Sequence, residues 1–213
     1  MSSSRRLYVK DQTVKQIEIQ SRLTLSYLVF MAMGGILAAV AILTDSVPIL
    51  IGAMVIAPAL PPLNLVAVAL VGGKPRLALQ GLGTGLTGIL VATIFTMLTT
   101  YILDLTNVIP PEIEAMEKWL LEERVQSGWY SVTAAFAAGI AGTIALAKQE
   151  QDKLVGVVAA LALVPASAAA GISLIYGDLY QCFGGIKLLG TNIVCIIISG
   201  IITLLIIKPD RRD

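Results

Sequence analysis

Three prolines stand close together near the middle of a long apolar segment. Pro58, Pro61 and Pro62 lie within residues 48–71. Each proline removes a backbone N–H and clashes with the preceding helical turn, so a helix should break here. In a lipid bilayer, the carbonyls that lose their donors need protein or a watered cavity around them. Such carbonyls can bind a cation or a polar solute, and the N-terminus of a half-helix can bind an anion.

A second proline stands at a matching place later in the chain. Adding 104 to the number of Pro61 gives Pro165, again inside an apolar segment rich in small residues. We therefore predict a site in the membrane between two broken helices. Its predicted residues are Pro58, Pro61, Pro62, Asn64, Pro165, Ser167 and Asn192. The alternative is that the prolines are helix kinks which neighbouring helices accommodate.

Other polar residues lie on the helices that would flank this site. Thr84, Thr87 and Thr191 are accessory candidates, although each hydroxyl could simply bond its own helix backbone. Lys187 lies about one turn into its apolar segment and could line an anion path or reach outward to the headgroups.

The residue types that mark enzymes and metal sites are missing from the apolar segments. The chain has no histidine, and no Asp or Glu lies at the middle of a predicted span. Proton coupling through a buried carboxylate thus has no candidate. We expect no enzyme activity, no catalytic residue, no metal and no cofactor.

The composition predicts an integral membrane protein. Of 213 residues, 56% are hydrophobic and 14% are charged, whereas soluble domains average about 25% charged residues. The net charge of +1 gives no reason to expect nucleic acid as a partner. We expect the lipid bilayer as the main partner.

Apolar and polar segments alternate in a way that predicts an all-α protein with six transmembrane helices, of which the second and fifth are broken. We predict a basic cytoplasmic arm with a short amphipathic helix (1–22), a membrane domain (23–207) and a basic cytoplasmic tail (208–213). Within the membrane domain, the predicted parts are a first repeat (23–103), an external amphipathic helix (110–126) and a second repeat (128–207).

One offset relates the two halves, which predicts an internal duplication. Adding 104 carries Gly35 to Gly139, Gly52 to Gly156, Gly73 to Gly177, Gly81 to Gly185 and Thr87 to Thr191. Three spans per copy require the second copy to be inverted. With both termini in the cytoplasm, 12 of the 15 Lys and Arg residues fall inside: five in the arm, two near residue 74, two near residue 150 and three in the tail.

Three motifs resemble a prokaryotic membrane family known as domain of unknown function 389. They are Ile51-Gly-Ala-Met-Val-Ile-Ala-Pro58, Leu161-Ala-Leu-Val-Pro165 and Leu189-Gly-Thr-Asn192. This chain departs from the family at Ala166, where a second proline is usual, and it has only a short arm where many members carry a soluble domain. The resemblance implies a polytopic protein of a bacterial inner-type membrane, without an established substrate.

Two functions follow as hypotheses. The first is a transporter or channel for a small solute or ion that binds near mid-membrane between the broken helices. The alternative is a membrane scaffold or assembly protein that binds partner subunits or lipid. Glycine pairs four residues apart, such as Gly81 and Gly85, indicate close helix packing, and similar small-residue faces on spans three and four also suggest a homo-oligomer.

Overall fold

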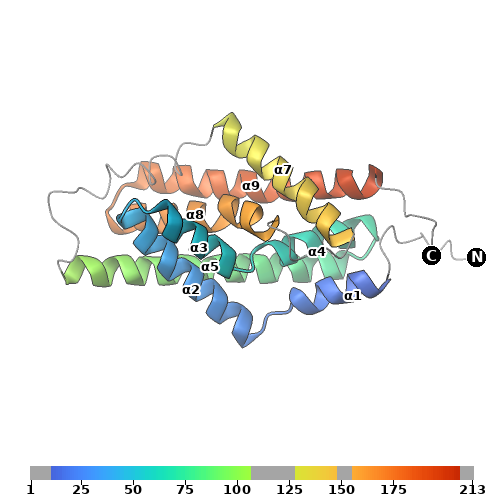
Figure 1. Cartoon of the computed structure of the whole chain (residues 1–213), viewed down its shortest axis with the longest axis horizontal. Helices are drawn as coiled ribbons and strands as arrows, with labels where there is room; N and C mark the ends of the chain where they lie inside the picture. The colour runs from blue at the N-terminus through green and yellow to red at the C-terminus, as the bar shows by residue number, and fades with distance from the viewer. Residues whose placement is uncertain (1–10, 107–127, 148–154, 207–213) are drawn as a thin grey trace, which may run out of the picture.

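The protein is helical throughout the part that the structure describes. The computed structural model covers residues 11–106, 128–147 and 155–206, so the predicted external helix (110–126) and tail (208–213) lie outside the described residues. The helices are α1 (Asp11–Gln20), α2 (Leu25–Leu43), α3 (Val47–Ile56), α4 (Leu60–Val71), α5 (Pro75–Leu105), α7 (Trp129–Ala147), α8 (Val155–Ile175) and α9 (Leu179–Ile206) (Figure 1). The all-α prediction is confirmed.

Several of these helices are long and apolar enough to cross a membrane. α2, α5 and α9 each qualify alone, and α3 with α4 forms a bent pair that counts as a fourth span if the pair is one element. α7 and α8 contain shorter apolar helical segments, which are not counted as spans. The described residues thus indicate an integral membrane protein with three or four candidate spans, and the count of six stays a prediction.

The break predicted between residues 47 and 71 is present. α3 ends at Ile56, α4 begins at Leu60, and the two helices are bent by 50°. Ala57, which precedes Pro58, is extended with φ −79° and ψ 115°, as a residue before proline prefers. Pro61 and Pro62 lie in the first turn of α4, where a missing N–H removes no helical bond.

The second predicted break is wrong, because α8 is one helix from Val155 to Ile175 with Pro165 inside it. The difference lies in the number of prolines. Pro58, which ends α3, corresponds to Ala162 in the second half, and Pro62 corresponds to Ala166. A lone proline costs one backbone bond and some steric strain, and a packed membrane helix can tolerate that. The break between α3 and α4 thus has no equivalent break in α8, and the predicted symmetric pair of broken helices is absent from the described residues.

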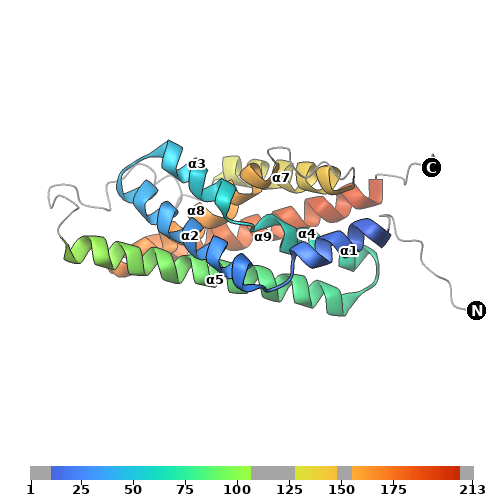
Figure 2. The same ribbon diagram turned by 60° about the horizontal axis from the view of Figure 1, so that its bottom comes forward.

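The helices pack in two similar groups. α2 packs on α5 and on α3, and α7 packs on α9 and on α8. The groups meet where α5 contacts α8, α4 contacts α9, and α3 contacts α8. Figures 1 and 2 show α5 and α7 on opposite sides of the bundle, and Figure 1 shows α5 and α9 running in opposite directions. Large buried side chains from both groups, among them Met31, Leu63 and Ile196, share one core.

The bounds of the helices repeat at the same offset as the sequence. Adding 104 to 25–43, the bounds of α2, gives 129–147, the bounds of α7. The same step carries the end of α4 to the end of α8, and the start of α5 to the start of α9.

The turns after α4 and α8 also match. Gly73 and Gly177 have positive φ of 66° and 76°, a conformation that glycine adopts without steric cost. Lys74 N–H donates to the Ala69 carbonyl at 2.8 Å, and Asp178 N–H donates to the Ser173 carbonyl at 2.9 Å. Both helices end in this way with the same capping geometry.

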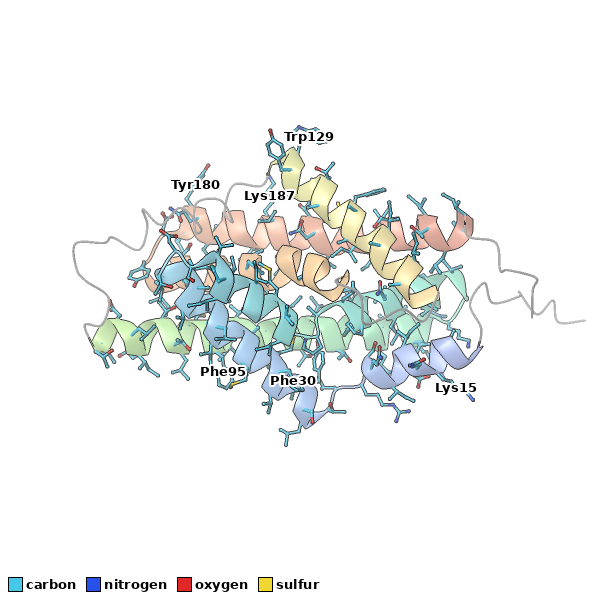
Figure 3. The ribbon with its side chains drawn as sticks, in the orientation of Figure 1. Lys15, Phe30, Phe95, Trp129, Tyr180 and Lys187 are labelled. Atoms are coloured by element: carbon cyan, nitrogen blue, oxygen red, sulfur yellow. The ribbon has the colours of Figure 1, made fainter. Side chains whose placement is uncertain are left out.

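The amphipathic helix predicted in the N-terminal arm is α1. Val14 and Ile17 are buried, while Lys15 is exposed (Figure 3). The buried face packs against Leu65 and Val68 of α4, so α1 is part of the bundle.

Candidate membrane-embedded site

The break between α3 and α4 (residues 57–59) is rich in backbone acceptors. Ala57 N–H donates to the Ala53 carbonyl at 3.2 Å, which is the last helical bond of α3. Pro58 has no N–H for the Met54 carbonyl, and Ala59 N–H donates to the Ala57 carbonyl at 2.9 Å. Pro61 and Pro62 remove two of the donors that the N-terminus of α4 would offer. The break therefore favours a cation or a hydrogen-bond donor over an anion.

Neighbouring helices enclose the break. Ala57, Ala59 and Leu60 are buried. A Cβ built at Gly34 of α2 would lie 2.7 Å from the Cβ of Ala57, and one built at Gly142 of α7 would lie 3.1 Å from a methyl group of Leu60. Both glycines let a helix approach the break closely, which is the protein environment that an interrupted membrane helix needs.

Asn64, one turn after the break, is buried with 4% of its surface exposed. Its amide nitrogen lies 3.4 Å from the position of a Cβ built at Gly142, so the side chain is directed toward α7. The amide therefore presents hydrogen-bonding groups to the helices that enclose the break.

Hydroxyl groups of α7 and α9 lie where these two helices pack together beside α4. A Cβ built at Gly200 of α9 would lie 3.0 Å from Thr143 Oγ1 and 3.2 Å from Cβ of Ala67, a residue of α4. A Cβ built at Gly139 would overlap Oγ of Ser199. Side chains of α4, α7 and α9 therefore meet at one place, which we name the α4–α7–α9 junction: Asn64, Thr143, Ser199 and Gly200.

The other predicted site residues lie on α9 and α8. Asn192 is buried on α9, and Ser199 and Thr203 lie seven and eleven residues further along the same helical face. Ser167 is buried on α8, where its hydroxyl donates to the Val164 carbonyl of its own helix at 2.9 Å. Pro165 lies beside it inside the unbroken helix.

The accessory candidates have simpler surroundings. Thr191 donates its hydroxyl to the Lys187 carbonyl at 2.9 Å, so its own-backbone alternative is confirmed. Lys187 is exposed on α9 (Figure 3), which favours the outward-reaching alternative. Thr84 is buried and its carbonyl accepts a bond from the Tyr27 hydroxyl at 3.3 Å, and Thr87 is half-buried.

Sequence reasoning missed Thr143, Ser199 and Thr203. A usable signal was present, because Gly139 and Thr143 are four residues apart, as are Ser199 and Thr203, and small residues at this spacing mark close helix contacts. The same contacts show that Gly81, Gly85 and Gly139 pack inside the chain. These small-residue faces therefore no longer argue for a homo-oligomer.

Charged side chains separate toward opposite ends of the bundle. Lys74 and Arg76 lie at the α4–α5 turn, and Asp178 lies at the α8–α9 turn at the other end (Figure 1). Burial raises the pKa of the Tyr176 phenol beside this second turn, and the negative charge of Asp104 raises it further. Among the described residues, no group of three or more His, Cys, Asp or Glu side chains could hold a metal ion.

Comparison with known proteins agrees with the three motifs. The family described as domain of unknown function (DUF389) matches residues 54–198, which include the break, Pro165 and Asn192. The chain belongs to the DUF389 family. This DUF389 protein is similar to an uncharacterized protein of Methanocaldococcus jannaschii, with 27% identity over 167 residues.

The match covers 78% of this chain and 49% of the relative, so the chain spans about half the length of the curated relative it matches. No solved structure matches the chain significantly.

Proposed function

We propose that this DUF389 protein is a membrane transporter or channel for a small solute or ion. The observation that carries the proposal is the enclosed break between α3 and α4, where the Met54 carbonyl has lost its helical donor and Asn64 is buried one turn away. An interrupted helix in the membrane is costly unless protein or a watered cavity surrounds its free backbone groups. Transporters use such groups to bind their substrates and ions.

We further infer that the two halves are an inverted duplication. The matched helix ends support this, and so do the closest helix contacts. Gly35 packs on Ala92, and Gly139 packs on Ile196, which are the same two positions 104 residues apart.

Equivalent carbonyls support the same inference. A Cβ built at Gly81 would lie 2.7 Å from the Pro62 carbonyl oxygen, and one built at Gly185 would lie 3.1 Å from the Ala166 carbonyl oxygen. The opposite directions of α5 and α9 and the opposite charges of Lys74 and Asp178 agree with inversion. We therefore propose that both termini lie in the cytoplasm.

Liposome flux tests the transport proposal. The purified chain is reconstituted, and uptake of monovalent and divalent ions, ammonium compounds and small neutral solutes is compared with empty liposomes. We expect at least one solute to move faster with the protein. Gly142→Val should slow this movement because its side chain would press against Leu60 and Asn64 and displace the helices beside the break, whereas Gly190→Val should not, because nothing lies within 4 Å of Gly190. Silence of folded protein across the panel would contradict transport.

The unbroken α8 favours one second candidate, a membrane scaffold. Without a second break, the bundle lacks the paired half-helices of many carriers. A scaffold should hold a stoichiometric partner subunit when it is purified gently from its native membrane, and native mass spectrometry would detect that subunit. A chain recovered without a partner, together with measurable flux in liposomes, would reject the scaffold.

A further inference from the structure

Lys187 is the only charged residue along α9. Its side chain is exposed, and within the described part of the chain it forms no ion pair. A lone charge on a membrane helix is costly and is normally neutralised by a partner. We propose that this partner is an anionic phospholipid, whose phosphate oxygens accept hydrogen bonds from the Lys187 ammonium group at the edge of the bundle where α7 and α9 begin.

The depth of Lys187 suits a contact with a lipid headgroup. α9 has 28 residues and is one of the candidate spans. It is therefore about 42 Å long, which matches the roughly 40–45 Å of a bilayer with its headgroups. Lys187 follows Leu179, the first residue of α9, by eight residues, so it lies about 12 Å from the start, a few ångströms inside the hydrocarbon edge. A lysine at that depth extends outward and places its ammonium group among the phosphates.

Aromatic side chains share the face of α9 on which Lys187 lies. Tyr180 and Phe183 precede Lys187 by seven and four residues, so the three lie on one side of the helix. Both rings are largely exposed, at 86% and 68%. Gly190 follows on this side after three residues, and nothing lies within 4 Å of a Cβ built there. The face therefore offers a lipid one cation, two rings and an open place on the helix surface.

α7 and α9 run in the same direction where they pack together. A Cβ built at Gly139 of α7 would lie 2.7 Å from the carbonyl oxygen of Ile196 on α9. Four residues further along each helix, Thr143 lies beside Gly200. The residues that precede these contacts on the two helices therefore lie toward the same end of the bundle.

The first turn of α7 brings two more exposed rings to this end. Trp129 precedes the first of these contacts by ten residues on α7, and Lys187 precedes it by nine residues on α9. Figure 3 shows Trp129, Tyr180 and Lys187 on the same side of the bundle. Trp129 and Tyr130 are 87% and 91% exposed, and Trp and Tyr rings are enriched at the headgroup level of membranes. A lysine among such rings is placed to meet a phosphate.

Only one of the two halves carries this combination. The position equivalent to Lys187 in α5 is Gly83, and the position equivalent to Trp129 in α2 is Leu25. α7 and α9 carry no Asp or Glu that would compete for the lysine. Under the proposed orientation, the anionic lipid belongs to the outer leaflet.

Fluorescence quenching by brominated lipid tests the site. Trp119→Phe leaves Trp129 as the only tryptophan, since the sequence has two. The chain is reconstituted in vesicles of equal parts phosphatidylglycerol and phosphatidylcholine, with bromine on the acyl chains of one lipid and then of the other. We expect the anionic lipid to be enriched about fivefold over the zwitterionic lipid beside Trp129, the ratio expected for one lysine near a headgroup.

Lys187→Gln should bring the two quenching levels together, and Lys187→Met provides a second neutral variant in case the first inserts poorly. Lys187→Arg should keep the difference because it keeps the charge. Lys15→Gln is the matched control, since it removes the charge of an exposed lysine on α1, and it should also keep the difference (Figure 3).

Equal quenching by the two lipids when Lys187 is intact, or a difference that survives both neutral substitutions, would overturn the site. The outcome is independent of the proposed transport function, because the site lies on the exposed surface of α9 and the measurement involves no flux.

Discussion

Glycine positions set how closely the helices of this protein approach one another. At Gly35, a Cβ would overlap the backbone carbonyl of Ala92. The facing helix cannot yield there without moving as a whole, because the obstructing atoms belong to its backbone. Close packing of this kind is a main source of stability in membranes, where lipid is as apolar as the helix surface.

Replacement of Gly35 should therefore be far more harmful than replacement of an outward glycine. Gly35→Ala should destabilise the protein by about 1–3 kcal/mol, the usual cost of overpacking. Gly83→Ala should be neutral or stabilising by up to about 1 kcal/mol, because nothing lies within 4 Å of Gly83 and alanine is the better helix former. Melting temperatures in detergent measure both changes. Equal losses would contradict the packing described for α2 and α5.

The interrupted α3–α4 pair follows from its prolines, and Pro58 is the residue that ends α3. Pro48 offers a natural comparison, because it lies in the first turn of α3, where its missing N–H costs nothing. The position of a proline within an element thus decides whether it breaks a helix or begins one.

Replacing Pro58, Pro61 and Pro62 together by alanine should restore the bond to the Met54 carbonyl and straighten the pair, because no proline then remains inside the joined helix. Spin labels at the exposed positions Val47 and Leu70 would report the change in a chain without Cys182 and Cys195. For helices bent by 50°, full straightening lengthens the end-to-end distance by roughly 3 Å at 1.5 Å rise per residue. Pro48→Ala should leave the distance unchanged. A longer distance in Pro48→Ala as well would mean that the labels report something other than the break.

Sequence reasoning predicted the first break closely, because three prolines within five residues remove several helical hydrogen bonds and clash with the preceding turns. It failed at Pro165, because a single proline can stay within a packed helix and the pattern does not say how the neighbours respond. Asn64 was predicted from its type and place. Thr143 and Ser199 were missed: their spacing indicates a close helix contact, but which helices meet there depends on how α4, α7 and α9 cross.

At the scale of the whole molecule, the two halves have helix bounds that match at an offset of 104 residues. The turns that follow α4 and α8 share their glycine conformation and their hydrogen bonds. They differ in charge, since Lys74 and Arg76 follow the first and Asp178 follows the second.

Inversion predicts that these two turns lie on opposite faces of the membrane. In a chain without native cysteines, Lys74→Cys should react with a membrane-impermeant thiol reagent only from the cytoplasmic side, and Asp178→Cys only from the outer side. Labelling of intact cells and of inside-out vesicles distinguishes the two. Reaction of both cysteines from the same side would reject inversion and, with it, the orientation proposed for the termini.

The matched glycine turns also bear on how the protein is made. During synthesis, the insertion machinery meets two hairpins of the same shape, and their backbones give it no means of telling one from the other. Under the proposed inversion, the lysine and arginine after Gly73 and the aspartate after Gly177 are the local charges that decide which hairpin stays in the cytoplasm and which is translocated. A chain that lost this difference in sign would be expected to insert in both directions and yield two upside-down populations in one cell.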